Sequence, residues 1–326
     1  MQTRETALNE WLKMILGETA FIVTPLAGDA SFRRYFRLHT DGLTRVIMDA
    51  PPNKETIAPF IQIGGLLAKN GVHTPTIYAV DDKQGFVLLE DLGDALLLGV
   101  LSSDNADKLY ALAMKTLLDI QRIPAVVPAF NTTFMHNELA LFREWFLESY
   151  LGLELSADET ALLKNTFDWL TTQIKNQPQV LIHRDYHSRN LILASDTLGV
   201  IDFQDAMIGP YTYDLVSLLK DCYIQWPREK IMQWTAYFHQ HLPSEQQGSL
   251  DEFNRAFDLC GLQRHLKVLG VFCRLHLRDN KPGYLRDLPL TFNYVMSCLE
   301  AYDELQPFYC FMRVSVQKTF LQKMKP

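Results

Sequence analysis

The sequence predicts an α+β fold with two lobes, a small β-rich lobe over residues 1–92 and a larger helical lobe over residues 93–326. Short apolar runs typical of strands fill most of the chain up to residue 90, and long runs with helical spacing follow. The 326 residues exceed the roughly 100–200 of a usual domain, and 48% hydrophobic residues can build a substantial core. We expect a cleft where the two lobes meet.

The first lobe is predicted to contain an opening helix, several strands and one interior helix. Residues 1–18 have the mixed polar and apolar pattern of a short amphipathic helix. The expected strands are Phe21–Leu26, Tyr35–Leu38, Thr44–Asp49, Thr76–Val80 and Phe86–Glu90. Between the third and fourth strands, Ile57–Lys69 has helical spacing and stops at Asn70-Gly71, a common helix end.

The second lobe is predicted to be mainly helical, with three short apolar runs in its middle. The expected helices are Asn105–Arg122, Asn137–Tyr150 and Asp158–Asn176. The apolar runs are Val180–Ile182, Leu191–Leu193 and Gly199–Phe203. From Tyr213 onward the pattern is helical again, with breaks near Pro227, Pro243, Pro282 and Pro289.

Charge and cysteine content narrow the class of protein. The chain has 31 Lys and Arg against 38 Asp and Glu, a net charge of −7, which disfavours a nucleic-acid-binding role. Five cysteines form neither a C-x-x-C pair nor an even disulfide set, so we expect buried thiols in a reducing compartment. The longest apolar run, Ala95–Leu101, falls short of the roughly 18 residues needed to cross a bilayer, and residues 1–18 do not resemble a signal peptide. We expect a cytoplasmic protein with a small-molecule substrate, no membrane contact and no obligate protein partner.

One tract carries the residues for phosphoryl transfer. His183 to Asn190 fits H-x-D-x-x-x-x-N, and Asp202 closes the apolar run that follows. This chemistry needs a carboxylate that accepts the proton of the attacking hydroxyl, here Asp185. It also needs oxygen ligands for Mg²⁺, here Asn190 and Asp202. An isolated Asp or D…N spacing is often only a turn or a chance match, but the preceding His and the flanking apolar runs favour the functional interpretation.

The tracts HRDYHSRNLIL and GVIDFQDAMIGPYTYDLVSLLKD resemble the aminoglycoside phosphotransferase family, whose fold is similar to that of protein kinases. Four further tracts narrow the resemblance, namely Asp29–Leu38, Val46–Pro52, Leu88–Gly93 and Gly261–Leu275. They are similar to the branch that acts on amino sugars recycled from the bacterial cell wall. The resemblance implies ATP and Mg²⁺ as cofactors, and the anomeric hydroxyl of N-acetylmuramate or N-acetylglucosamine as the acceptor.

The same resemblance assigns roles residue by residue. It makes Asp185 the catalytic base, and Asn190 and Asp202 the metal ligands. His183 would position the catalytic loop, and Asp214, at the start of a helix, would hold the backbone of that loop from below.

Nucleotide contacts are also implied by the resemblance. Glu90 and Leu92 fall in Leu88–Gly93, where the family has the hinge whose backbone holds adenine. Gly28 and Ser31 fall where the family has a turn that covers the phosphates, and Arg33 follows on the strand that forms the roof over the nucleotide. A single Gly in a polar loop is more often an ordinary turn, so position alone supports this assignment.

The chain departs from the family at one point. The third strand has Met48 where the family has a Lys that pairs with the phosphates, and the following helix lacks the Glu that holds this Lys. Arg33 and Arg34 follow the covering turn, and on a strand they would point to opposite faces. At most one of them could then face the nucleotide, and the alternative is a pair of solvated arginines.

The segment from Gly261 to Lys281 is unusually cationic. On a helix, Arg264, Lys267, Arg274 and Arg278 would share one face. One alternative is the solvated side of an amphipathic helix. The other alternative is that this face binds the acceptor sugar. N-acetylmuramate carries a lactyl carboxylate that Arg264 or Arg274 could bind.

Two other functions compete with the sugar kinase. Another small alcohol, such as an aminoglycoside, choline or homoserine, could be the acceptor, and a cationic acceptor would favour an acidic pocket. A non-catalytic nucleotide-binding regulator is suggested by the missing Lys, but the complete set of Asp185, Asn190 and Asp202 argues against it.

Overall fold

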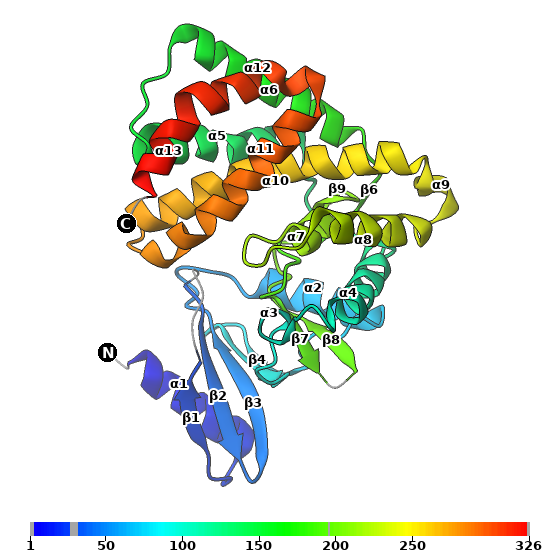
Figure 1. Cartoon of the computed structure of the whole chain (residues 1–326). Coiled ribbons are helices and arrows are strands. Elements are labelled where there is room, and N and C mark those ends of the chain that lie inside the picture. Colours follow the sequence, from blue (N-terminus) through cyan, green and yellow to red (C-terminus); the bar gives the residue numbers. More distant parts are fainter. Residues whose placement is uncertain (1–2, 27–31, 195, 325–326) are drawn as a thin grey trace. The chain divides into compact units, whose positions relative to one another are not determined.

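The computed structural model describes residues 3–26, 32–194 and 196–324 of the chain. The chain divides into two compact units (Figure 1). The first comprises Met1–Val100 and Asn190–Asp205, and the second comprises Leu101–Arg189 and Ala206–Pro326. Residues 190–205, which the prediction placed with the helical lobe, thus belong to the first unit. The antiparallel sheet of the first unit and the helices of the second confirm the predicted α+β class.

An antiparallel sheet forms the body of the first unit, with strand order β1-β2-β3-β5-β4. The strands are β1 (Ile22–Pro25), β2 (Arg34–Thr40), β3 (Leu43–Asp49), β4 (Ile77–Asp81) and β5 (Phe86–Glu90). The turn between β2 and β3 is Asp41-Gly42, and both residues have positive φ, 22° and 81°. Asp-Gly is the pair that such tight hairpin turns favour, and it sets the register in which Tyr35 pairs with Met48.

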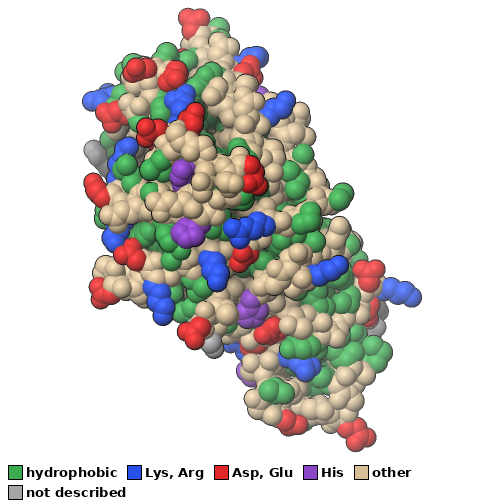
Figure 2. All heavy atoms as spheres, turned by 90° about the vertical axis from the view of Figure 1, so that its right-hand side faces the viewer, with side chains coloured by type: hydrophobic (Ala, Val, Ile, Leu, Met, Phe, Trp, Pro, Cys, Tyr) green, Lys and Arg blue, Asp and Glu red, His purple; other side chains and the backbone are tan. Residues whose placement is uncertain are grey.

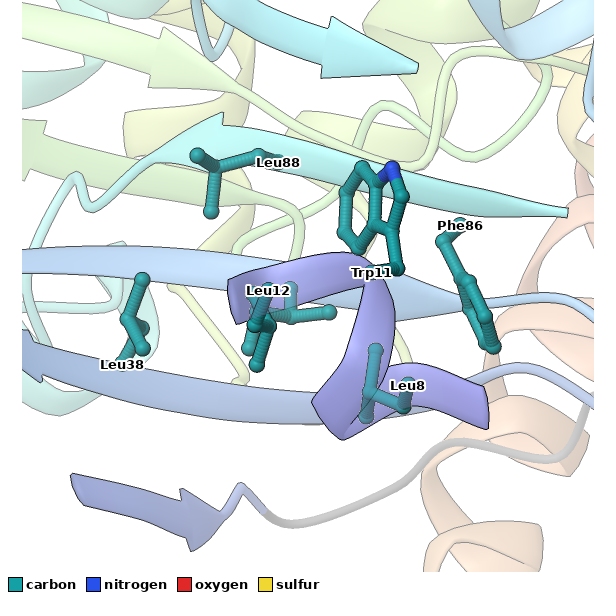
Figure 3. Packing of buried hydrophobic residues seen from close by; sticks show 7 residues of the cluster. Leu8, Trp11, Leu12, Leu38, Phe86 and Leu88 are labelled. Atoms are coloured by element: carbon teal, nitrogen blue, oxygen red, sulfur yellow. The ribbon is translucent and has the colours of Figure 1, made fainter. Parts of the chain in front are cut away.

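Helix α1 (Arg4–Leu16) covers one face of this sheet. Figure 3 shows Leu8, Trp11 and Leu12 of the helix pointing toward Leu38, Phe86 and Leu88 on the strands. These side chains are buried, and Ile47 of β3 completes the cluster. Because side chains alternate across a strand, Met48 and Tyr35 lie on the opposite face from Ile47.

The hairpin of β7 (Leu191–Ala194) and β8 (Thr197–Val200) is built into the first unit by backbone hydrogen bonds. Leu193 N–H donates to the Ala95 carbonyl beside α3 (Leu97–Val100) at 2.8 Å, and Val200 N–H donates to the His73 carbonyl at 2.8 Å. Phe203 stacks on Phe60 of α2 (Ala58–Lys69), with 4.9 Å between the ring centroids. The segment that carries Asn190 and Asp202 is therefore packed within its own unit.

The second unit is mainly helical around α10 (Leu250–Leu277). Ser249 and Glu252 form a reciprocal capping box at the start of α10. The other helices are α4 (Ala106–Gln121), α5 (Thr132–Leu141), η1 (Phe142–Tyr150), α6 (Ala157–Lys175), α7 (Tyr213–Leu219), α8 (Arg228–Gln240), α9 (Ser244–Gln247), η2 (Pro282–Asp287), α11 (Leu288–Ala301), η3 (Asp303–Leu305), α12 (Gln306–Phe311), η4 (Met312–Val316) and α13 (Gln317–Lys323). Gly270 of α10 lies so close to α5 that a Cβ there would stand 2.3 Å from the Leu141 backbone.

The structure corrects three expectations. Strand β9 (Met207–Pro210) pairs antiparallel with β6 (Gln179–Ile182), although its short sequence, with Gly and Pro, has no strand pattern. Strand β8 ends at Val200, three residues before the expected end at Phe203, because Asp202 has a φ of 64° that no strand residue adopts. All five cysteines are free, but Cys310 is exposed, whereas the other four are buried as expected.

Acidic and basic side chains lie interspersed on the face shown in Figure 2. Among the residues that the structure describes, no helix is both long enough and apolar enough to span a membrane.

Candidate active site

The backbone of the loop from His183 to Arg189 is held in place by a buried carboxylate. Asp214, at the start of α7, accepts hydrogen bonds from the N–H groups of His183 at 2.6 Å and Arg184 at 2.9 Å. Arg184 has a φ of 76°, a conformation that a non-Gly residue keeps only when its surroundings hold it. Burial raises the pKa of Asp214 to about 7, against the effect of these two hydrogen bonds. The predicted role of Asp214 beneath the loop is confirmed.

Asp185 is held as an ionised carboxylate. Burial alone would raise its pKa, but the positive charges of Lys267, His187 and Arg264 outweigh burial and lower the pKa to about 2. The backbone N–H of Asp185 donates to Nδ1 of His183 at 3.3 Å, which fits the predicted positioning role of His183. At neutral pH, Asp185 can therefore accept a hydrogen bond from a hydroxyl group.

The cations around Asp185 are anchored by a buried acid that the sequence analysis missed. Glu138 of α5 pairs with Lys267 Nζ at 2.8 Å and Arg184 Nη2 at 3.3 Å, and it accepts a hydrogen bond from Gln263 at 3.0 Å. Burial opposes ionisation of Glu138, but Lys267 outweighs it and lowers the pKa of the carboxyl. Three elements, α5, α10 and the catalytic loop, thus meet in one ion cluster.

A second buried carboxylate fixes the far end of the loop. Asp221, just after α7, accepts hydrogen bonds from Ser188 N–H at 3.0 Å and Ser188 Oγ at 2.5 Å. The Arg189 guanidinium lies 3.6 Å from the ring centre of Tyr223, and His187 packs edge-on against the same ring. The loop is therefore anchored on both sides of Asp185, and Asp221 and Tyr223 are residues that sequence reasoning did not identify.

The predicted metal ligands come together in the first unit. The amide of Asn190 lies 3.4 Å from Asp202 Oδ2, and Gln204 Nε2 donates to Asp202 Oδ1 at 2.8 Å. A carboxylate and an amide oxygen are hard donors of the kind that Mg²⁺ binds together with substrate phosphates. Asp202 has a left-handed φ of 64°, a conformation that a non-Gly residue keeps only when its surroundings hold it. The donor set therefore fits Mg²⁺, although no cluster of three His, Cys, Asp or Glu suited to a metal occurs among the described residues.

The predicted hinge, Leu88–Gly93, is fixed by hydrogen bonds and packing within the first unit. Glu90 accepts hydrogen bonds from Thr76 N–H at 3.1 Å and Thr76 Oγ1 at 2.8 Å. These contacts outweigh burial and lower the pKa of Glu90. Leu92 packs on β8, where a Cβ at Gly199 would stand 2.5 Å from it. The roles of Glu90 and Leu92 in adenine binding remain predictions.

Two of the predicted nucleotide contacts, Gly28 and Ser31, lie outside the described residues. Arg33 precedes β2 and pairs with Glu55, Nε to Oε2, at 2.6 Å, and its side chain is only 10% exposed. Arg34 begins β2 and pairs with the buried Asp49. The alternative of two solvated arginines is therefore wrong for Arg33, because an ion pair holds it in a buried position.

The basic residues predicted to share one face of α10 differ in their exposure to solvent. Arg264 is 5% exposed, and its Nη1 lies 3.7 Å from Cys222 Sγ. Lys267 is similarly enclosed with Glu138, whereas Arg278 pairs with Asp279 at the exposed end of the helix. Arg274 lies between these extremes, and burial together with Arg278 lowers its pKa. The solvated interpretation is wrong for Arg264 and Lys267 and correct for Arg278.

Comparisons with known proteins agree with this chemistry. The profile of the phosphotransferase enzyme family matches residues 22–248. A Pseudomonas aeruginosa protein named N-acetylmuramate/N-acetylglucosamine kinase is 42% identical over 86% of this chain and 85% of its own length. A Neisseria meningitidis protein of the same name is 38% identical over 95% of both chains. The GDP complex of aminoglycoside 2'-phosphotransferase-IIIa has a TM-score of 0.62 at 20% identity, covering 90% of this chain and 99% of that one. This structural likeness confirms the predicted protein-kinase-like fold.

Proposed function

The chain belongs to the phosphotransferase enzyme family, and we propose that it transfers the γ-phosphate of ATP to the anomeric hydroxyl of N-acetylmuramate and N-acetylglucosamine. The names of the relatives that match most of this chain support the choice of acceptor. The observation that carries the catalytic assignment is the state of Asp185. It stands in a phosphoryl-transfer motif, and neighbouring cations lower its pKa to about 2.

In this proposal, Asp185 acts on the acceptor hydroxyl. Its carboxylate accepts a hydrogen bond from the anomeric O–H and aims the oxygen lone pair at the γ-phosphorus. The proton passes to Asp185 as the bond from oxygen to phosphorus forms and the bond to the ADP leaving group breaks. Because a carboxylate of such low pKa is a weak base, orientation dominates its contribution, and the proton moves late.

Asn190 and Asp202 would hold Mg²⁺ when the nucleotide is bound. The ion would supply positive charge that neutralises the phosphates as charge shifts to the leaving group. Gln204 contributes by orienting Asp202 through the 2.8 Å hydrogen bond. Adenine would lie against the backbone of Leu88–Gly93, near Glu90 and Leu92, and Gly28 and Ser31 would contact the phosphates.

The charge around Asp185 favours an acceptor without a positive charge. Lys267, Arg264 and Arg184 all act on this carboxylate. A choline or an aminoglycoside would bring more positive charge to the same place, which costs free energy. N-acetylmuramate instead brings a carboxylate, and Arg264 and Arg274 remain our candidates for its contact.

We place the enzyme in the cytoplasm. Its cysteines are all free, which suits a reducing compartment, and its phosphate donor is ATP.

A panel of acceptors tests the proposal. The enzyme is incubated with ATP and Mg²⁺, and ADP release is measured with N-acetylmuramate, N-acetylglucosamine, choline, homoserine and an aminoglycoside. We expect turnover with the two amino sugars at least a hundredfold above the other acceptors. Turnover with choline or an aminoglycoside but with neither sugar would overturn the choice of acceptor. Nucleotide binding without turnover on any acceptor would instead favour a regulator.

A further inference from the structure

The structure suggests which charge pair acts in place of the missing Lys and Glu. Protein kinases hold the ATP phosphates with a Lys on the third strand, which a helix Glu pairs with. Here that strand position is Met48, which is completely buried. The following helix, α2, contains no acid. If a side-chain cation of the unit that holds Met48 and Asp202 binds the phosphates, it comes from another position.

Arg33 and Glu55 form such a pair at the edges of the same two elements. Arg33 immediately precedes β2, and Glu55 lies three residues before the start of α2. Their side chains meet at 2.6 Å and are only 10% and 20% exposed. Glu55 Oε1 also accepts a hydrogen bond from the Phe32 N–H at 3.3 Å, so the acid fixes both the backbone and the side chain of this corner.

Tyr35 connects the Arg33–Glu55 pair to the strand position where the family has Lys and this chain has Met48. It lies directly across the sheet from Met48 and on the same face. The charges of Arg33, Asp202 and Glu55 all act on its hydroxyl, so the Tyr35 side chain lies close to each of the three. Arg33, Tyr35, Met48 and Asp202 all belong to the first unit, and Tyr35 lies between the ion pair and the strand that carries Met48.

We propose that Arg33 binds the β-phosphate of the nucleotide and that Glu55 is the positioning residue that holds Arg33 for this contact. In this proposal, Arg33 binds phosphate as the strand Lys does in protein kinases, and Glu55 holds Arg33 as the helix Glu holds that Lys. A guanidinium suits the task, because its planar fork can bind two phosphate oxygens at once. This inference rests on the proposed function, since it needs ATP as the donor.

Arg34 provides a matched control. It is the next residue, it is also an arginine, and it also forms an ion pair. However, it pairs with Asp49 on the face that α1 covers, where Arg4 contacts the same carboxylate at 2.8 Å. Because β2 and β3 place Arg34 opposite Asp49, its charge lies on the other face from Met48. Removing Arg34 leaves Asp49 paired with Arg4.

Calorimetric binding of ADP and adenosine to the full chain, with Mg²⁺ present, tests the proposal. For Arg33→Ala we expect ADP affinity about ten- to hundredfold weaker and adenosine affinity unchanged, because only ADP has the β-phosphate. Arg34→Ala should bind both ligands within about twofold of the wild type. Glu55→Gln should show a smaller, ADP-selective loss, and Arg33→Lys should recover part of the affinity. The Michaelis constant for ATP should rise in the same order.

The outcomes separate this inference from the proposed function. Unchanged ADP affinity in Arg33→Ala, or equal losses for ADP and adenosine, would overturn the role of Arg33. An ADP-selective loss in Arg34→Ala of the same size would overturn the choice between the two arginines. If neither amino sugar is phosphorylated while Arg33→Ala still loses ADP selectively, the acceptor proposal fails and the inference stands.

Discussion

Asp185 and Asp214 serve the same loop, yet their pKa values shift in opposite directions. Burial acts on both. Around Asp185 four positive side chains outweigh burial and lower its pKa. Asp214 is contacted by two backbone N–H groups, which do not outweigh burial, so its pKa is raised. The cationic neighbours thus select Asp185, and not the acid beneath it, as the carboxylate that is ionised at every working pH.

Replacing Asp185 with Asn removes the proton acceptor and keeps the size of the side chain. We expect turnover to fall by about 10²–10⁴, because this is the usual contribution of a general base. ADP affinity should stay near that of the wild type, since the proposed mechanism gives Asp185 a contact with the acceptor and none with the nucleotide. Turnover with N-acetylglucosamine and calorimetry with ADP measure the two effects. Near-wild-type turnover would show that another group accepts the proton.

The raised pKa of Asp214 predicts how stability depends on pH. An unfolded Asp titrates near 3.9, whereas folded Asp214 titrates near 7. Between these values the folded state binds more protons, so Asp214 makes unfolding easier as the pH rises, by at most about 1.4 kcal/mol per pH unit. Asp185 is ionised in both states from about pH 5 upward. It stabilises the fold above pH 4, and that contribution is lost as the pH falls toward 2.

Asp214→Asn should remove the contribution of Asp214 to this slope. Urea unfolding of the wild type and the variant from pH 4 to 7 measures it. We expect the free energy of unfolding to decrease more steeply with pH in the wild type. Parallel curves would mean that Asp214 is ionised throughout.

At the scale of elements, the site depends on α5 and α10 meeting through Glu138 and Lys267. Removing either partner leaves a buried charge uncompensated, so Glu138→Gln and Lys267→Met should each reduce the free energy of unfolding by about 3–5 kcal/mol. The double variant should lose much less than the sum. The exposed pair Lys164–Asp168, at 2.6 Å, provides the control, and its variants should cost about 0.5 kcal/mol or less. Strictly additive losses for Glu138 and Lys267 would contradict the pairing.

The close approach of α10 to α5 gives a second prediction for these elements. Gly270→Ala would place a Cβ 2.3 Å from the Leu141 backbone, which must shift, so we expect a loss of about 1–3 kcal/mol. Gly261→Ala on the same helix would meet no atom closer than Val216 Cγ1 at 3.4 Å, an ordinary van der Waals contact. There the better helix propensity of Ala should leave stability equal or raise it by up to about 1 kcal/mol. Thermal unfolding of both variants measures the difference, and equal effects would contradict the close approach.

Most elements could be predicted from the sequence, because their apolar residues recur with the period of a helix or a strand. The exceptions have physical reasons. Strand β9 is four residues long and is formed by pairing with β6, which no local pattern shows. The end of β8 is set by the left-handed Asp202, a conformation imposed by the surrounding structure. The helix that begins at Thr132 also starts five residues before the expected Asn137.

At the scale of the whole molecule, the net charge of −7 conceals a cationic site. Asp185, Asn190 and Asp202 could be found from the sequence because their motif is compact. Glu138 and Lys267 are 47 residues before and 82 residues after Asp185, so only folding brings them to its loop. Arg33 could be named as a candidate, but its partner Glu55 depends on how the corner folds.

Selectivity between N-acetylmuramate and N-acetylglucosamine tests whether the cationic segment from Gly261 to Lys281 binds the lactyl carboxylate. Arg264 acts on Asp185, so neutralising it should impair both sugars. Arg274 is not among the four cations that act on Asp185, which makes Arg274→Gln the cleaner variant. We expect kcat/KM for N-acetylmuramate to fall about ten- to hundredfold more than for N-acetylglucosamine, the size of a lost charge-assisted contact. Arg278→Gln, at the exposed end, is the control. Equal losses for both sugars in Arg274→Gln would assign Arg274 a structural role.

Phosphorus NMR of the product tests the central claim most directly, because it identifies the atom that receives the phosphate. The wild-type enzyme is given ATP, Mg²⁺ and either N-acetylglucosamine or its 1-O-methyl glycoside, which lacks an anomeric hydroxyl. We predict a sugar phosphate whose phosphorus is coupled to the anomeric proton, formed from the free sugar and absent with the glycoside. A phosphorylated glycoside, or a phosphate coupled to any other sugar proton, would contradict the account.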